Sequence, residues 1–243
     1  MLELKEIDKN FWKDGQQLPV LTEVSLKLQK GERFVLLGRS GCGKTTLLRC
    51  MGGFLQPDAG QVILDGAPVE APGIDRMMVF QDFNQLCPWM TLKKNLTYAL
   101  KKGRRELSKE ERENVAMKFI QMAGLSGFEN QYPAALSGGM KQRGALARAL
   151  ALQPKLLLMD EPFSSLDYLS RQTARETVLK LQEQTGCTIF LVTHDLEDAV
   201  ELGTRIGILD EEAHKVSKIC LPAEFKDKES LMQELKRIFH SGT

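Results

Sequence analysis

The sequence predicts an α/β fold in which a parallel β-sheet core carries an inserted helical segment. Residues 33–38, 155–160 and 188–193 are apolar runs with the unbroken hydrophobic character of strands buried on both faces. Each run ends in a small or polar residue and leads into a segment of helical character, which is typical of a parallel sheet. Between residues 81 and 155 the pattern is helical, so we expect a helical subdomain there.

The other elements follow from periodicity and from the signals at their ends. Alternating apolar and polar residues predict two half-exposed strands of an N-terminal antiparallel β subdomain, at 2–7 and 23–28. Short strands are also expected at 61–65, 77–81 and 214–220, and helices at 91–101, 108–123, 138–152 and 228–239. Ser108 and Glu111 form a capping-box pattern at the start of the second of these helices.

The length of 243 residues suits one large domain with an inserted subdomain. No internal repeat or low-complexity linker interrupts the sequence. We expect an α/β core at 1–85 and 153–210, a helical subdomain at 86–152, and a C-terminal strand and helix at 211–243.

Composition and charge argue against several classes of protein. With 33 basic and 32 acidic residues the net charge is +1, so the basic excess typical of a nucleic-acid surface is missing and no nucleic-acid partner is expected. The five cysteines are scattered and form no CxxC pair, which argues against a disulfide framework and against structural zinc and favours a reducing compartment. The N-terminus is charged from its third residue, and no apolar run approaches the length of a membrane span.

The segment "GRSGCGKTT", residues 38–46, has the Gly-x-x-x-x-Gly-Lys-Thr spacing of a P-loop and lies between a predicted strand and a predicted helix. Glycines in such a loop let consecutive backbone amides turn inward around a phosphate. Lys44 can reach the β and γ phosphates of a nucleotide, and the Thr45 hydroxyl can ligate Mg²⁺. The alternative is a chance glycine-rich turn, and the strand–loop–helix context disfavours it. The expected nucleotide-binding residues are Gly38, Ser40, Gly41, Cys42, Gly43, Lys44, Thr45 and Thr46.

The apolar strand "LLLMDEP" delivers two carboxylates to the same edge of the predicted sheet. Asp160 ends the strand, where it can hold Mg²⁺ through water. Glu161 follows directly and can polarise a water for in-line attack on a γ-phosphate. A solvated acidic pair is the alternative, and it would be the default interpretation without the P-loop.

Two further strand ends carry polar side chains. His194 closes the apolar run "IFLVTH" and can bind a γ-phosphate or steady the attacking water. Gln81 ends the strand "MMVFQ" and can offer its amide to Mg²⁺ or to water. A structural role is the alternative for His194, since a lone histidine at a strand end is more often structural.

A second anion-binding pattern lies in "LSGGMKQRGALARAL", residues 136–150. Ser137, Gly138 and Gly139 form a small-residue turn before an alanine-rich helix, so backbone amides are exposed at the positive end of a helix dipole. The sequence therefore predicts two phosphate cradles in one chain.

Together these motifs resemble the nucleotide-binding subunit of an ATP-binding cassette (ABC) transporter. The chain carries, in the order typical of that family, the Walker A loop "GRSGCGKTT", the glutamine of "VFQ", the signature "LSGGMKQR", the Walker B segment "LLLMDEP", the D-loop "SSLD" and the switch "TH". The resemblance implies a P-loop NTPase fold and ATP hydrolysis with ATP and Mg²⁺, with Glu161, His194 and Gln81 as the catalytic residues.

The resemblance also implies an explanation for the second cradle. Two copies would pack head to tail, so that Ser137, Gly138 and Gly139 of one copy bind the γ-phosphate held by Lys44 of the other. Asp167 of the D-loop would lie across the same interface. Adenine would stack on an aromatic residue ahead of Walker A, either Phe11 or Trp12, of which Phe11 better matches the usual position.

A membrane partner is a further implication of the resemblance. In the family, a groove formed here by residues 82–91 accepts a short helix of a permease, and Phe83, Leu86, Pro88 and Trp89 supply apolar side chains in this presumed surface loop. The chain would then be peripheral, on the cytoplasmic face of the cell membrane, and linked indirectly to an extracytoplasmic solute-binding protein. A partner-free alternative is that Trp89 only caps the helical subdomain.

The local sequences "CPWMTLKKN" and "EPFSSLD" look most like importers of the nitrate, taurine, sulfonate and bicarbonate group. Such relatives often read "LPW" and "FGALD", so this chain departs from them at Cys87 and at Ser164-Ser165. Two other classes stay open: an ABC exporter with separate membrane subunits, and a soluble ABC ATPase of iron–sulfur cluster assembly.

Overall fold

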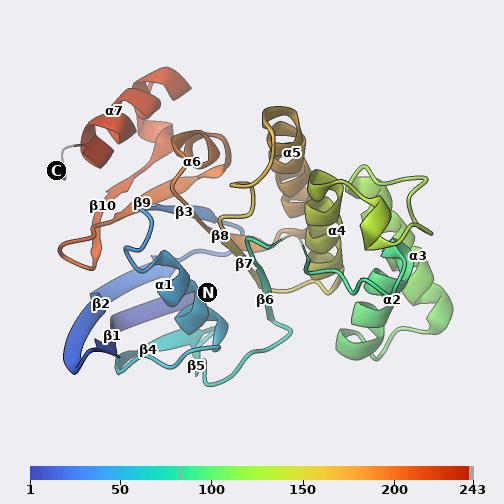
Figure 1. Cartoon of the computed structure of the whole chain (residues 1–243), viewed down its shortest axis with the longest axis horizontal. Coiled ribbons are helices and arrows are strands. Elements are labelled where there is room, and N and C mark those ends of the chain that lie inside the picture. Colours follow the sequence, from blue (N-terminus) through green and yellow to red (C-terminus); the bar gives the residue numbers. More distant parts are fainter. Residues whose placement is uncertain (83, 241–243) are drawn as a thin grey trace. The chain divides into compact units, whose positions relative to one another are not determined.

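The computed structural model describes residues 1–82 and 84–240, and these form two compact units. The first unit comprises Met1–Gly73, Leu158–Glu161 and the described residues from Thr188 onward. The second unit comprises Ile74–Leu157 and Pro162–Cys187. Figure 1 labels the elements of both units.

A largely parallel sheet forms the centre of the first unit (Figure 1). Strand β3 (Arg33–Leu37) pairs in parallel with β8 (Thr188–Thr193) and β9 (Arg205–Leu209), and β10 (Val216–Cys220) pairs antiparallel with β9. The last three residues of β7 (Leu156–Asp160) also belong to this unit, and β7 follows β8 in the strand order.

The carboxyl ends of three of these strands lie at one edge of the sheet. Leu37 of β3 is in register with Thr193 of β8. The Glu161 amide, directly after β7, donates to the Val192 carbonyl at 3.0 Å. The loops that follow β3, β7 and β8 therefore emerge side by side.

Helices cover the sheet of the first unit and fill its core. Helix α1 (Lys44–Gly52) contacts both β8 and β2, while α6 (Leu196–Leu202) contacts β3 and β8, and α7 (Lys228–His240) packs on α6. The short 3₁₀ helix η2 (Pro222–Glu224) precedes α7. Within the sheet, the rings of Phe34 and Phe190 stack with their centroids 5.3 Å apart.

An antiparallel sheet completes the first unit, as the sequence predicts. Its strand order is β2-β1-β4-β5, with β1 (Leu2–Lys13), β2 (Gln16–Leu28), β4 (Ala59–Leu64) and β5 (Ala67–Pro68). Strands β1 and β2 are joined by the two-residue turn Asp14-Gly15, whose φ angles are 51° and 78°. Both residues of a type I′ hairpin turn need positive φ, which explains this Asp-Gly pair.

The hairpin is longer than the strands predicted at 2–7 and 23–28. Residues 11–19 are all exposed, so no alternation of buried and exposed side chains marks them as strands. Asp14-Gly15 is the one local signal that could have revealed the hairpin.

The second unit is mainly helical. Its elements are β6 (Arg76–Val79), α2 (Leu92–Gly103), α3 (Lys109–Met122), the 3₁₀ helix η1 (Pro133–Ala135), α4 (Gly138–Ala151) and α5 (Tyr168–Thr185). Each of these α-helices begins with an N-cap side chain that accepts a hydrogen bond from a backbone amide. The N-cap residues are Thr91, Ser108, Ser137 and Asp167. Helices α2, α3 and α4 contact one another, and α4 also contacts α5.

Most of the predicted elements are present. The α/β class is confirmed, and the helices predicted at 91–101, 108–123 and 138–152 begin and end within two residues of α2, α3 and α4. The capping box of Ser108 and Glu111 is formed. Strand β9 was not assigned from the sequence, because Gly207 interrupts its short apolar run. A glycine is required there, since a Cβ atom would lie 2.6 Å from the Phe34 ring.

The two units do not follow the domain boundaries expected from the sequence. The segment predicted to be helical, 86–152, lies within the second unit, but that unit also includes Pro162–Cys187. The C-terminal strand and helix belong to the first unit. The division into core, helical and C-terminal parts stays a prediction.

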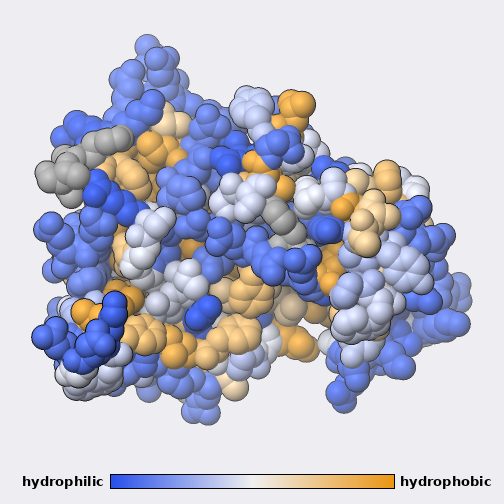
Figure 2. Space-filling view, in the orientation of Figure 1, coloured by the Kyte–Doolittle hydropathy of each residue, from blue (hydrophilic) through white to orange (hydrophobic). Residues whose placement is uncertain are grey.

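The described residues contain no helix that is long and apolar enough to cross a membrane. Figure 2 shows a face on which most residues are hydrophilic and hydrophobic residues gather in small groups.

Candidate functional site

The loop between β3 and α1 has the backbone geometry that an anion cradle needs. Gly41 and Gly43 have φ angles of 87° and 105°, in the left-handed region that favours glycine. Gly43 is the N-cap residue of α1 and has no side chain that could accept hydrogen bonds from the first amides of the helix. In α6 of the same unit, by contrast, the Asp195 side chain accepts such hydrogen bonds. The first amides of α1 are therefore left for an external acceptor at the positive end of the helix dipole.

Close packing holds this loop in place. A Cβ atom on Gly43 would lie 2.7 Å from the Val20 carbonyl oxygen of β2, and one on Gly38 would lie 2.5 Å from the Cys42 sulfur. Ser40 and Gly41 are exposed, Thr46 is half-buried, and Cys42 is buried. Burial also raises the pKa of the Cys42 thiol, although the nearby Lys44 charge opposes this shift. Cys42 is thus a packing residue of the loop in this structure.

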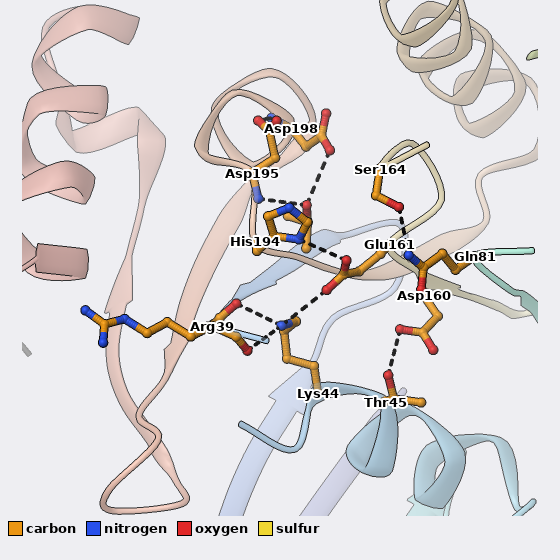
Figure 3. A network of polar contacts seen from close by, with 12 residues as sticks. Arg39, Lys44, Thr45, Gln81, Asp160, Glu161, Ser164, His194, Asp195 and Asp198 are labelled. Atoms are coloured by element: carbon orange, nitrogen blue, oxygen red, sulfur yellow. Dashed lines mark hydrogen bonds and ion pairs between the residues drawn. The ribbon is translucent and has the colours of Figure 1, made fainter. Parts of the chain in front are cut away.

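Lys44 points its ammonium group across the loop (Figure 3). Its Nζ donates to the carbonyls of Gly38 at 2.8 Å and Arg39 at 2.7 Å, and lies 3.3 Å from Oε1 of Glu161. The side chain is only 4% exposed. A buried cation with three oxygen partners at the mouth of an amide cradle is well placed to bind a phosphate.

Thr45 and Asp160 meet beside Lys44. The Thr45 hydroxyl donates to Oδ1 of Asp160 at 3.0 Å. Burial raises the pKa of the Asp160 carboxyl, and the neighbouring Glu161 charge adds to this effect, while the Thr45 hydrogen bond opposes it. A carboxylate that has lost its hydration is stabilised more by a nearby cation than an exposed carboxylate is.

These two side chains fit Mg²⁺ held jointly by protein and phosphate. The described residues contain no group of three or more His, Cys, Asp or Glu side chains that could hold a metal ion alone. Mg²⁺ commonly uses one or two protein oxygens, with waters and substrate phosphates completing its octahedron. One hydroxyl and one carboxylate next to the cradle satisfy that requirement.

Glu161 lies between a lysine and a histidine (Figure 3). Its Oε2 is 2.9 Å from Nδ1 of His194 and its Oε1 faces Lys44. A carboxylate only accepts hydrogen bonds, so Nδ1 of His194 carries the proton and Nε2 is directed elsewhere. Glu161 also has a φ angle of 42°, which is rare for a residue other than glycine and which the sequence did not reveal.

A buried network, which sequence reasoning missed, holds the turn that carries His194. The Thr193 hydroxyl donates to Oδ2 of Asp198 at 3.3 Å and accepts from the Asp195 amide at 3.0 Å. Thr193 and Asp198 are each 2% exposed. In the sequence, Asp198 is a carboxylate at the third position of the helix that follows the strand. Nothing in the pattern indicates that this side chain is buried.

Phe11 and Trp12 lie near the tip of the β1–β2 hairpin and are both exposed. Phe11 pairs across the strands with Leu18, two residues from Val20, which packs on Gly43. The Lys9 ammonium lies 5.9 Å from the centre of the Phe11 ring. Because Phe11 is not packed under the sheet, its ring is available for stacking.

In the second unit, Ser137, Gly138 and Gly139 begin α4. The Ser137 side chain accepts from the Met140 amide at 3.3 Å and is exposed. Gly139 is buried against α5, where a Cβ atom would lie 3.0 Å from Cβ of Ser170. The glycine thus lets the start of α4 approach α5, while the Ser137 turn faces solvent.

Gln81 and Asp167 also belong to the second unit. Nε2 of Gln81 donates to the Ser164 hydroxyl at 3.1 Å. Asp167 is the N-cap of α5 and accepts from the Ser170 amide at 3.0 Å. The hydrogen bonds from Ser170 hold the pKa of the Asp167 carboxyl below its ordinary value.

The loop 82–91 differs in part from expectation. Leu86 is buried at 2% exposure, because it packs near Gly144 of α4, so its place in an exposed apolar cluster was wrong. Trp89 is 72% exposed, and Phe83 lies outside the described residues. The buried Asn95 side chain holds residues 87–91: it donates to the carbonyls of Cys87, Met90 and Thr91 and accepts from the Cys87 amide.

The structure therefore brings Lys44, Thr45, Asp160, Glu161 and His194 together in the first unit. Gln81, Ser137, Gly138, Gly139 and Asp167 are carried by the second unit. The residues of the first unit follow strands whose carboxyl ends meet at one edge of the sheet. In the second unit, Ser137 and Asp167 lie at the starts of α4 and α5.

Comparison with known proteins gives consistent matches. The family model described as ABC transporter matches residues 21–164. The taurine import ATP-binding protein of Pseudomonas aeruginosa is 42% identical over 224 residues, which cover 92% of this chain and 84% of that protein. The bicarbonate transport ATP-binding protein of Synechococcus elongatus is 44% identical over 85% of this chain, which spans only 31% of that longer protein.

A solved structure matches as well. It is a dimeric post-hydrolysis state of an ATP-binding cassette bound to ADP and phosphate. It is 33% identical, with a TM-score of 0.79 over 91% of this chain and 99% of its own.

Proposed function

The chain belongs to the ABC transporter family as an ATPase, and on that premise we propose that it powers import of a small anion through a membrane permease. The contacts of the P-loop residues Lys44 and Thr45 with Glu161 and Asp160 are the observation that carries the chemistry. The relatives named for taurine import and bicarbonate transport support an anionic solute, since both solutes bear an anionic group.

Phosphate binding is assigned to the loop between β3 and α1. The amides that follow Gly41 and Gly43 surround the phosphates, and Lys44 neutralises the β and γ oxygens. Phe11 stacks on the adenine, since it lies on the hairpin whose Val20 packs against the loop. Trp12, at the neighbouring position, is the alternative.

Thr45, Asp160 and Gln81 are the residues that would hold Mg²⁺. When bound, this ion would neutralise charge on the phosphates and orient them for in-line attack. Asp160 suits this role because its buried carboxylate lacks the stabilisation of bulk water.

Glu161 is assigned as the general base for hydrolysis. It takes a proton from the attacking water as the water oxygen bonds to the γ-phosphorus, and the bond to the ADP oxygen breaks. His194 holds Glu161 through Nδ1, which leaves Nε2 to contact the water or the γ-phosphate.

Two copies of the chain complete each site. Ser137, Gly138 and Gly139 of one copy bind the γ-phosphate held by the other, and Asp167 lies at the same interface. The exposed Ser137 turn at the start of α4 and the dimeric state of the solved cassette support this arrangement.

The permease binds at residues 82–91, on the cytoplasmic face of the membrane. Exposed Trp89 supplies the apolar contact, and buried Asn95 holds residues 87–91 through its hydrogen bonds. A solute-binding protein outside the membrane delivers the anion to the permease. An exporter or a soluble assembly ATPase would use the same hydrolytic residues with different partners.

Two exposed tryptophans provide a matched test of the partner. Trp89 and Trp12 are 72% and 74% exposed, so either can be replaced by alanine without loss of buried contacts. We expect a multi-helix permease to co-purify with the parent and with Trp12→Ala from detergent-solubilised membranes of the source organism. With Trp89→Ala, the amount of co-purified permease should fall several-fold, as measured by quantitative mass spectrometry of the bound proteins.

Two results would contradict the proposal. Recovery of soluble scaffold proteins alone would favour an assembly ATPase. Equal permease recovery with Trp89→Ala would remove the 82–91 loop from the interface.

A further inference from the structure

The D-loop contains a serine whose hydroxyl reaches the glutamine that follows β6. The chain reads Phe163-Ser164-Ser165-Leu166 at this place. Ser164 Oγ accepts from Nε2 of Gln81 at 3.1 Å (Figure 3). Glycine or alanine at position 164 has no side-chain oxygen to make this contact.

The turn that presents Ser164 is firmly anchored. The Leu166 amide donates to the Phe163 carbonyl at 3.1 Å, which closes a four-residue turn with the two serines at its centre. Phe163 is fully buried and Leu166 is 9% exposed, so both ends of the turn are fixed in the interior of the second unit. Ser164 therefore offers its hydroxyl from a defined position, whereas Ser165 is exposed.

The backbone around Gln81 is also held. The Gln85 side chain accepts from the Phe80 amide at 2.9 Å and donates to the carbonyls of Phe80 and Asp82 at 2.8 and 2.7 Å. This contact pattern fixes the main chain on both sides of Gln81. The Ser164 hydrogen bond then fixes the side chain.

We propose that Ser164 is a positioning residue that orients the Gln81 amide for catalysis and thereby links the glutamine to the D-loop. An amide whose nitrogen donates to Ser164 directs its oxygen to the opposite side, and oxygen is the atom that can ligate Mg²⁺ or accept from water. Without the hydroxyl, the exposed amide is free to rotate by half a turn and present nitrogen instead. The inference rests on the proposed role of Gln81.

The same contact connects Gln81 to the interface residue Asp167. Only Ser165 and Leu166 separate Ser164 from Asp167, which caps α5. A shift of the D-loop in a dimer would therefore move the hydroxyl that orients Gln81.

The test compares Ser164→Ala with the control Ser165→Ala, which removes a neighbouring hydroxyl that is exposed. Steady-state ATPase activity is measured at saturating ATP over a Mg²⁺ titration, together with the Kd of a fluorescent ATP analogue. We expect Ser164→Ala to lower kcat by about threefold to tenfold, the effect of losing one hydrogen bond, and to raise the Mg²⁺ concentration for half-maximal rate. Nucleotide Kd should stay within about twofold, and Ser165→Ala should match the parent.

Two further variants separate positioning from a structural effect. Ser164→Thr keeps the hydroxyl and should restore the parental rate, including the case in which Ser164→Ala folds poorly. Adding Ser164→Ala to Gln81→Ala should cause no further loss, since the hydroxyl acts through that amide.

The outcomes distinguish this inference from the proposed function. A parental rate in Ser164→Ala, a multiplicative loss in the double variant, or a defect in Ser164→Thr equal to that of alanine would overturn the inference. A parental rate in Gln81→Ala would instead remove Gln81 from the proposed catalytic site.

Discussion

Glu161 joins the nucleotide-binding loop to the histidine turn through its two carboxylate oxygens. Oε1 lies 3.3 Å from the Lys44 ammonium and Oε2 lies 2.9 Å from His194 Nδ1. Its backbone has a φ angle of 42°, and its amide donates a hydrogen bond to the Val192 carbonyl. Such a conformation costs about 1–3 kcal/mol, so the surrounding packing must hold it, and residues of this kind cluster at active sites.

Replacing Glu161 with glutamine tests this residue. The amide keeps the size of the side chain but does not act as a general base, so hydrolysis should slow by about two orders of magnitude or more while ATP binding persists. The ATP-bound dimer should accumulate, as measured by size-exclusion chromatography with light scattering.

Glu211→Gln is the matched control for Glu161→Gln. Glu211 pairs with Arg39 of the P-loop at 3.0 Å and is not among the residues proposed to act in catalysis. Removing this charge should leave the turnover rate within about twofold of the parental rate, since exposed ion pairs contribute little to stability. Near-parental turnover in Glu161→Gln would exclude the carboxylate as the base.

The loop before α1 depends on two glycines in different surroundings. Both Gly41 and Gly43 have positive φ angles, so alanine at either position is strained. A Cβ atom on Gly43 would collide with the Val20 carbonyl of β2, whereas one on Gly41 would meet nothing within 4 Å. The P-loop is therefore built against the antiparallel sheet at Gly43.

Alanine at the two positions should have different consequences. Gly43→Ala adds overpacking to backbone strain, so we expect it to lower the free energy of unfolding by about 1–3 kcal/mol more than Gly41→Ala does. Its affinity for ATP should fall as the cradle shifts. Urea denaturation and fluorescent-nucleotide titration measure the two effects, and equal destabilisation by both variants would contradict the packing at Gly43.

Sequence patterns predicted most elements, and the ends of three helices to within two residues, but not the contacts between elements. Buried strands and capped helices have strong periodic signals, and these elements were found where expected. Strand β9 was missed because Gly207 weakens its strand pattern. The small residue is needed for the close approach of the Phe34 ring, which is distant in the sequence. The buried carboxylate of Asp198 and the φ angle of Glu161 likewise depend on tertiary packing, which residue types alone do not encode.

The described residues include a polar cluster around Glu161 and a helix start at Ser137, which we propose act in hydrolysis and in anion binding. Lys44, Glu161 and His194 gather in the first unit, whereas the Ser137 turn belongs to the second. The chemistry of both features could be predicted from the sequence, because spacing and residue type define a P-loop and an N-cap. We propose that the two features act together across two copies of the chain.

Mixed dimers of two inactive variants test whether two copies share each site. Lys44→Ala removes the cation that we propose binds phosphate. Ser137→Arg blocks the start of α4, and the loss of the N-cap costs about 1 kcal/mol of stability. Each variant alone should be inactive, and thermal melting should show that both are folded. In an equal mixture, half of the dimers are mixed and each holds one intact composite site, so about a quarter of the parental ATPase rate should return. No recovery, with mixed dimers shown to form, would contradict a site shared between two copies.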